Sequence, residues 1–303
     1  HSLRTAVHRL NDIEDSLARA LIWGAAWDMT RDAELSATEY LTMVNGADLN
    51  AVEIAVAQQI LGQARTAIEY YAVPATRGEH RDNLFNHLLK LIEQSEAGSD
   101  YQLAFVKNAI SVARTEEHTN LLKQWFDGSA TPTGLVLDAD LRWAFVSQLV
   151  ALGAWDESVI DAEIARDNTA NGQRQEAAAR AEIPTTEAKA KAWHDTIERD
   201  DLANAIIENI IGGFSHPDQR ELLEAYVDEY FEVLPSVWAN RTNEIAQAIT
   251  FGYFPSLLAS QEILDKTDAF LATPQDPGCI RLVRESRDNV ARALKCQARD
   301  AKN

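Results

Sequence analysis

Cysteine is scarce in this sequence of 303 residues, which contains two, Cys279 and Cys296, both close to the C-terminal end. Two cysteines are too few for a disulfide framework, and these two lack the C-x-x-C spacing of redox and metal sites. We therefore interpret them as reduced thiols, the ordinary state of cysteine in the cytoplasm. The sequence accordingly favours a cytoplasmic protein.

Basic residues are also few relative to acidic ones: 28 Lys and Arg stand against 47 Asp and Glu, which gives a net charge of −19. Nucleic acids and anionic membranes both require a basic surface, so we expect neither as a partner. No apolar run approaches the roughly 18 residues of a membrane span. The sequence has no signal peptide at its start and begins at His1 without a Met, so we interpret it as a fragment of a longer protein.

Catalytic and metal-binding motifs are absent as well. The sequence has no H-E-x-x-H, no two histidines four residues apart, no G-x-S-x-G, no Walker loop, no G-x-G-x-x-G and no EF-hand loop. His80 and His87 are seven residues apart, and we favour a solvated helix surface over a metal site for this pair. We therefore predict no catalytic residue and no metal ligand in this sequence.

The sequence is rich in amphipathic helices, and residues 138–153 show the pattern most clearly. Two sets of apolar residues recur there at helical spacing; the first set is Leu141, Phe145, Leu149 and Leu152, and the second is Trp143, Val146 and Val150. A helix that is apolar on two faces has neighbours on both sides. Gly153 is suited to the left-handed position after its end. A second amphipathic helix at 156–164, a polar gap and a further pair follow, which is the pattern of a helical solenoid.

Similar helices are predicted along the whole chain, and no segment has the pattern of a strand. The other expected ranges are 12–31, 38–44, 52–71, 80–94, 101–114, 121–126, 188–197, 202–211, 222–233, 237–249, 256–270 and 280–298. We expect Pro235 to end the helix over 222–233. The prediction is an all-α fold, a HEAT/armadillo-like superhelix of antiparallel helix pairs. Residues 1–11 are a lead-in or the end of a preceding domain, and residues 12–303 form a single helical-repeat domain.

Tryptophan is well represented, and four of the seven tryptophans fall at positions where helices are expected to pack together: Trp23, Trp27, Trp143 and Trp193. The simplest interpretation is that they belong to the core. A peptide-binding wall built from some of them is the alternative.

Several segments, in order, resemble one known family. They are residues 17–35, 140–143, 151–153, 187–193, 217–222, 238–247 and 252–255. Between about residue 12 and residue 270 the chain resembles the C-terminal domain of the aminopeptidase N family of zinc aminopeptidases, which includes the endoplasmic-reticulum trimming aminopeptidases. The family's catalytic motifs, G-x-M-E-N and H-E-x-x-H, do not occur here. The resemblance thus implies the HEAT-like C-terminal domain without its enzyme, with zinc held by the catalytic domain of a parent chain.

In that family, this domain arches over the catalytic domain, closes a chamber around the active site and contacts the peptide beyond its N-terminal residues. The resemblance therefore implies two partners, the catalytic domain of the parent chain and a peptide substrate. Our candidates for contact with either partner are Arg241, Glu244 and Tyr253, followed by Arg142 and Trp143. The alternative for all five is a structural role in a buried ion pair or an aromatic core.

Two other functions are alternatives to this one. A free-standing helical-repeat scaffold that binds another protein is the main alternative, and a catalytic domain encoded upstream of His1 would decide between the two. An independent hydrolase has no supporting residues in the sequence.

Overall fold

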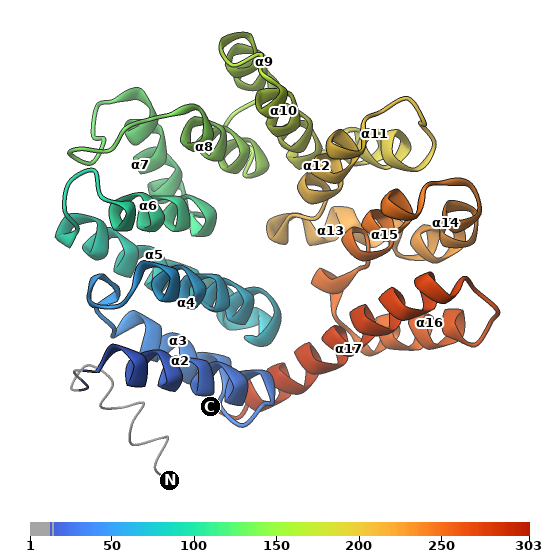
Figure 1. Ribbon diagram of the computed structural model, residues 1–303, viewed down its shortest axis with the longest axis horizontal. Coiled ribbons are helices and arrows are strands. Elements are labelled where there is room, and N and C mark those ends of the chain that lie inside the picture. The colour runs from blue at the N-terminus through green and yellow to red at the C-terminus, as the bar shows by residue number, and fades with distance from the viewer. Residues whose placement is uncertain (1–12, 14) are drawn as a thin grey trace. The chain divides into compact units, whose positions relative to one another are not determined.

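The computed structural model describes residue 13 and residues 15–303, so the lead-in expected over residues 1–11 lies outside the described part of the chain. The described residues form helices joined by short connections and include no strand (Figure 1). The prediction of an all-α fold is therefore confirmed. The chain divides into two compact units: unit 1 contains the residues up to Asp138 together with Arg292–Asn303, and unit 2 contains Ala139–Ala291. The single domain over residues 12–303 stays a prediction.

Unit 1 is built from helices that each follow the previous one after a short connection. They are α2 (Ser16–Arg31), α3 (Ala37–Asn45), α4 (Ile54–Thr66), α5 (Arg77–Gln94), α6 (Asp100–Val112), α7 (Glu116–Asp127) and the C-terminal end of α17 (Pro277–Asp300). Short polar side chains begin several of them: Asp15 caps α2, and Ser36 forms a capping box with Glu39 at the start of α3. Helix α3 packs on both α4 and α5, and α4 packs on α6, so each helix contacts its next neighbours along the stack. This is solenoid-type packing.

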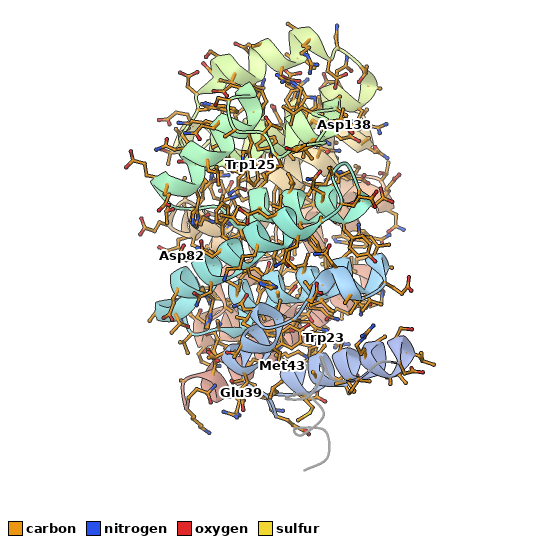
Figure 2. The ribbon with its side chains drawn as sticks, turned by 90° about the vertical axis from the view of Figure 1, so that its left-hand side faces the viewer. Trp23, Glu39, Met43, Asp82, Trp125 and Asp138 are labelled. Carbon is orange, nitrogen blue, oxygen red and sulfur yellow. The ribbon has the colours of Figure 1, made fainter. Side chains whose placement is uncertain are left out.

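Aromatic side chains fill the core of unit 1. Trp23 on α2 meets Tyr40 on α3 edge to face, with ring centroids 6.0 Å apart, and Figure 2 shows Trp23 and Trp125 on their helices. His80 is also buried, and its Nε2 lies 3.2 Å from the Thr38 hydroxyl. The expectation that His80 lies on a solvated surface was therefore wrong, because this face of α5 packs against α3.

Unit 2 continues the same kind of packing in two layers. Its helices are α8 (Ala139–Ala151), α9 (Glu157–Arg166), α10 (Ala170–Glu182), α11 (Thr186–Ile197), α12 (Asn204–Phe214), α13 (Arg220–Leu223), α14 (Val227–Asn240), α15 (Asn243–Gly252), α16 (Gln261–Leu271) and the first part of α17. In one layer α8, α10, α12 and α15 pack in succession, and α9, α11 and α14 cover them. Each unit therefore stacks helices as a solenoid does, while the assignment to the HEAT/armadillo type stays a prediction.

Two features of unit 2 differ from the sequence prediction. Helix α10 occupies the stretch that the sequence pattern left as a polar gap, and it packs extensively on α12. Pro235 lies inside α14 instead of ending a helix before it. The helix continues past the proline because Leu234 and Val237 are buried on either side of it and Trp238 Nε1 donates a hydrogen bond to Thr250 on α15.

Other expectations were met in detail. Gly153 has a φ of 66° directly after α8, the left-handed conformation expected of it. Trp23, Trp143 and Trp193 are buried, as the core interpretation requires. Both cysteines are unpaired and buried.

No helix within the described residues has both the length and the apolar character needed to cross a membrane.

Candidate functional site

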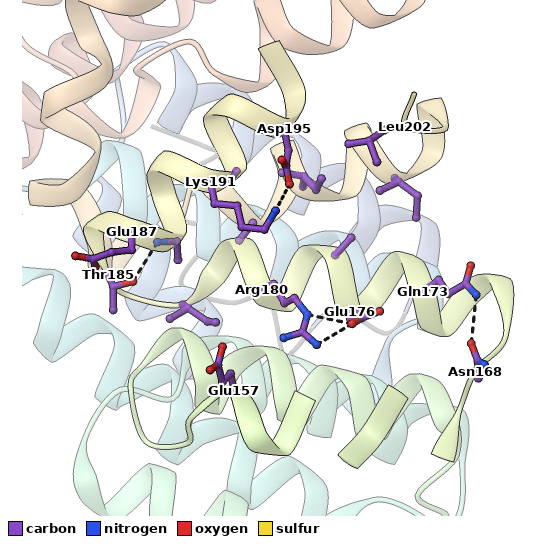
Figure 3. A pocket seen from close by; sticks show the side chains of 17 residues that line it. Glu157, Asn168, Gln173, Glu176, Arg180, Thr185, Glu187, Lys191, Asp195 and Leu202 are labelled. Atoms are coloured by element: carbon purple, nitrogen blue, oxygen red, sulfur yellow. Dashed lines mark hydrogen bonds and ion pairs between the residues drawn. The ribbon is translucent and has the colours of Figure 1, made fainter. Parts of the chain in front are cut away.

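Unit 2 contains a groove of about 710 Å³ that involves α9, α10, α11 and α12. Figure 3 shows its polar side chains around the space between these helices. Small and branched apolar side chains form its lining: Ala177, Ala181, Ile183, Ala188, Ala192, Leu202, Ile206 and Ile210. The groove exists because alanines on α10 and α11 leave space that larger side chains would fill.

Charged side chains surround this apolar lining, and most of them are paired with each other. Arg180 Nε donates to Glu176 at 3.0 Å, and Lys191 Nζ donates to Asp195 at 2.6 Å (Figure 3). Glu157 and Glu187 line the groove too, and each lies in the first turn of its helix, where a carboxylate complements the helix dipole. The rim therefore presents both signs of charge around an apolar floor.

This arrangement suits binding. The lining contains no histidine, cysteine or serine, and its lysine, Lys191, is paired with Asp195. Its hydroxyl group, on Thr185, caps α11 by accepting a hydrogen bond from the Ala188 amide. An apolar groove with a mixed polar rim favours a segment of peptide that buries some side chains and keeps others in water.

Arg142 and Trp143, predicted from the sequence, lie on α8 and hold α9 in place. Arg142 donates to both carboxylate oxygens of Glu163, at 2.9 Å from Nε and 2.7 Å from Nη2. Burial raises the pKa of Glu163, but the hydrogen bonds and charges of Arg142 and Arg166 outweigh it and leave that pKa below its ordinary value. Trp143 is fully buried, and its Nε1 donates to Asp167 at 2.9 Å. Both side chains thus fix the position of one groove wall.

Arg241 and Glu244 hold the connection between α11 and α12, which contributes Leu202 to the groove. Arg241 Nη1 donates to the carbonyl oxygens of Ile197, at 3.2 Å, and Arg199, at 2.6 Å. Glu244 is exposed and accepts a hydrogen bond from Asn204 at 2.6 Å. The two residues thus secure both ends of this connection.

Tyr253 supports α11 from the side opposite the groove. Its ring stacks on Trp193, with centroids 4.9 Å apart, and its hydroxyl lies 2.7 Å from that of Thr196. Burial raises the pKa of Tyr253, so its hydroxyl stays neutral and available for this hydrogen bond. Tyr253 itself is buried, as Trp143 is.

The five predicted residues therefore surround the groove, and none of them lines it. Sequence reasoning did not find the lining residues, because α10 was not recognised as a helix. One signal was present: alanine recurs every four residues, at 177 and 181 and again at 188 and 192, which places small side chains along one face of each helix.

A metal site is not part of this geometry. Among the residues that the structure describes, no group of three His, Cys, Asp or Glu side chains is placed to hold a metal ion.

The chain belongs to a known class of domain. The model of the ERAP1-like C-terminal domain family matches residues 1–292, and the chain is a member of that family. Aminopeptidase N from Streptomyces lividans is 46% identical to it over 301 residues, which cover 99% of this chain and 35% of that relative. The resemblance to the C-terminal domain of the aminopeptidase N family is thus confirmed. The chain spans about a third of the relative's length, so the rest of the relative has no counterpart here.

Proposed function

We propose that this chain is the non-catalytic C-terminal domain of a zinc-dependent aminopeptidase, where it caps the active-site chamber and helps to bind the peptide. The observation that carries the proposal is the identity of 46% to an aminopeptidase N, confined to 35% of that protein. The absence of an H-E-x-x-H motif from this sequence agrees with a catalytic centre that lies elsewhere in a longer polypeptide.

The residues of this chain indicate which part of the full-length protein would cleave the peptide and which part would bind it. The described side chains do not fit a zinc ion, so bond cleavage is assigned to the part of the longer protein that this chain lacks. What this chain supplies is a surface that restricts access to the catalytic centre and orients peptides within it. Contacts made with distant parts of a substrate increase the rate of the chemical step only when they help to position the reacting bond.

The groove of unit 2 is the surface that we assign to the peptide. Its floor is apolar and its rim carries Arg180 and Lys191 as well as Glu157 and Glu187, so it suits peptides of mixed sequence. Arg241 and Glu244 support the proposal indirectly, since both hold the connection that carries Leu202. In this proposal the five predicted residues position the groove walls, and Arg241 and Glu244 lie close enough to the surface to reach a bound peptide or the catalytic domain as well.

A comparison between this chain and the longer protein tests the proposal. The longer protein is expected to hold zinc and to release N-terminal residues from peptides in a chelator-sensitive reaction. This chain alone is expected to hold no stoichiometric zinc and to leave aminoacyl anilides intact. Zinc analysis and anilide hydrolysis measure both. A longer protein without zinc and without peptidase activity would reject the proposal and favour the helical-repeat scaffold.

A further inference from the structure

An apolar strip runs along the solvent side of α2. Leu17 and Leu21 are each 66% exposed, and they lie four residues apart, on one face of the helix. Gly24 follows three residues later and extends the same face. The opposite side of α2 packs on the rest of unit 1, where Trp23 is buried against Tyr40 on α3. The helix is therefore anchored without the strip.

The strip borders a hollow between α2 and the start of α4. The hollow measures about 210 Å³, and Leu17, Ala20, Val52 and Val56 give it an apolar lining. Ser16 and Glu53 line it as well. Strip and hollow together form one continuous apolar surface, which we call the α2 face.

The composition of the α2 face is unfavourable for a surface that stays in water. Burial of a leucine side chain stabilises a protein, and the two exposed leucines do not contribute that stabilisation within the described residues. A glycine inside a helix destabilises the helix relative to alanine. A Cβ atom at Gly24 would meet nothing within 4 Å, so the packing within the described residues does not require a glycine there. A missing side chain at this position leaves room for another element to approach the helix backbone closely.

The comparisons indicate what covers this face. The chain belongs to a family of C-terminal domains, and 35% of the length of the aminopeptidase N relative is matched. The unmatched part of a protein that ends in such a domain precedes it, and α2 is the first described helix of the chain. A second copy of the chain is a poorer occupant, because two chains with a net charge of −19 repel each other.

We propose that the α2 face is an intramolecular docking surface, covered by the polypeptide that precedes it in the full-length protein. This inference rests on the proposed function, since it requires a longer chain with a catalytic part before α2. It adds the place of contact: Leu17 and Leu21 insert into that preceding part, which in turn fills the hollow beside Val52 and Val56.

Thiol labelling of the full-length protein tests the inference. Cys279 and Cys296 are 1% and 2% exposed, and burial raises their pKa values to about 12 and about 11, so neither competes for the reagent. Leu21→Cys is the test variant, and Leu17→Cys is a second one on the same face. Val136→Cys is the matched control, because Val136 is 75% exposed and lies in the connection between α7 and α8, away from α2. Maleimide labelling is followed at each introduced cysteine by mass spectrometry, in native protein and in urea.

We expect both α2 variants to be labelled at least about tenfold more slowly in the native protein than in urea, since a covered thiol reacts only when the site opens. Val136→Cys should react at similar rates in both. Labelling of Leu21→Cys as fast as that of Val136→Cys in a native, zinc-containing and active protein would overturn the docking surface and leave the proposed function standing. A full-length protein without zinc or peptidase activity would overturn both.

Discussion

A single lysine joins three helices of unit 2. Lys189 on α11 is fully buried, and its ammonium donates to the carbonyl oxygens of Ala181, at 2.7 Å, and Phe214, at 2.8 Å. These carbonyls lie at the C-terminal ends of α10 and α12, where helices leave acceptors unsatisfied and carry partial negative charge. Burial lowers the pKa of Lys189 to about 8, although the nearby charge of Glu182 raises it. The hydrogen bonds therefore stabilise the fold, whereas the buried charge opposes it.

The variant Lys189→Met separates the effect of the hydrogen bonds from the effect of the buried charge, because the two depend differently on pH. Near pH 7 the lost hydrogen bonds and the relief of a buried charge offset each other. Between about pH 8 and 10.5, the folded and ordinary pKa values, the unfolded wild type binds more protons than the folded one, so wild-type stability rises with pH. We therefore expect the variant's deficit to grow through this window to on the order of 2 kcal/mol or more. Urea unfolding at pH 7 and pH 10 measures it.

Lys191→Met is the control for this experiment, because Lys191 lies on the same helix with 67% of its side chain exposed and pairs with Asp195. Its stability difference should stay below about 1 kcal/mol at both pH values. A deficit of Lys189→Met that is equal at pH 7 and pH 10 would contradict the assignment of a buried, titrating ammonium.

Glu182 gives the opposite pH dependence. Burial raises its pKa to about 7 from 4.5, while a hydrogen bond from Ser147 and the charge of Lys189 lower it. A raised carboxyl pKa contributes stability that is complete below pH 4.5 and is lost as the pH rises through 7. Glu182→Gln mimics the neutral form, so we expect it to match the wild type near pH 4.5 and to be more stable than the wild type at pH 8. Equal unfolding midpoints at pH 8 would show that this carboxyl is solvated.

At the scale of elements, α10 and α12 approach each other more closely than side chains normally permit. A Cβ atom added at Gly213 would lie 2.2 Å from the Ala178 carbonyl oxygen. Alanine and glycine therefore make this contact, and two other alanines of α10, Ala177 and Ala181, line the groove. Close packing of the backbones replaces the interlocking of large apolar side chains here.

Two neighbouring glycines provide a matched test of this contact. Gly213→Ala should destabilise the protein by about 1–3 kcal/mol, because backbone must move to accept the methyl group. Gly212→Ala, where a Cβ would meet nothing within 4 Å, should gain up to about 1 kcal/mol from helix propensity. Thermal and urea unfolding distinguish the two. Similar behaviour of both variants would mean that α10 and α12 are not in direct backbone contact.

These contacts show how far the sequence predicted the fold. The helices with large apolar side chains at regular spacing, such as α8, were predictable, because burial of such residues determines their periodicity. Helix α10 was not, since its buried residues are glycine and alanines, which carry almost no hydrophobic signal. The prediction at Pro235 failed for a different reason. The local propensity of proline disfavours the interior of a helix, but packing of the neighbouring residues against α15 overrides that preference.

The candidate site was predictable only in part, for the same physical reason. Arg142, Trp143 and Arg241 have large and distinctive side chains that stand out in the sequence, and each of them holds a wall of the groove. The lining depends on which small residues face the same space, and that is decided by the pairing of helices distant in sequence. Contact between peptide and the five residues predicted from the sequence stays a prediction.

At the scale of the whole molecule, the prediction to test is that Arg241 affects which substrates the full-length protein selects. Arg241→Ala in the full-length enzyme should free the connection between α11 and α12 and remove a cation near the groove. We expect kcat/KM to fall about tenfold or more for peptides, with little change for single-residue anilides, which cannot reach this distance. Steady-state kinetics on both substrate types measure the effect.

Glu244→Ala is the companion variant, since Glu244 holds the other end of the same connection and is exposed. An equal loss on peptides and anilides for Arg241→Ala would indicate a disturbed interface with the catalytic part. No loss on either substrate would show that Arg241 contributes neither to the shape of the groove nor to peptide binding.

The last helix has a consequence for how the protein is made. Asp300, near the end of α17, accepts hydrogen bonds from the backbone amides of Thr38 and Val73, and the Cys296 thiol donates to the Thr30 carbonyl. Unit 1 therefore draws its parts from two segments that are far apart in the sequence, the residues up to Asp138 and Arg292–Asn303. During translation its early helices leave the ribosome with a gap that stays open until Arg292–Asn303 have been made, and a product that stops before Arg292 never fills it. Completion of unit 1 thus reports that synthesis has passed Arg292–Asn303.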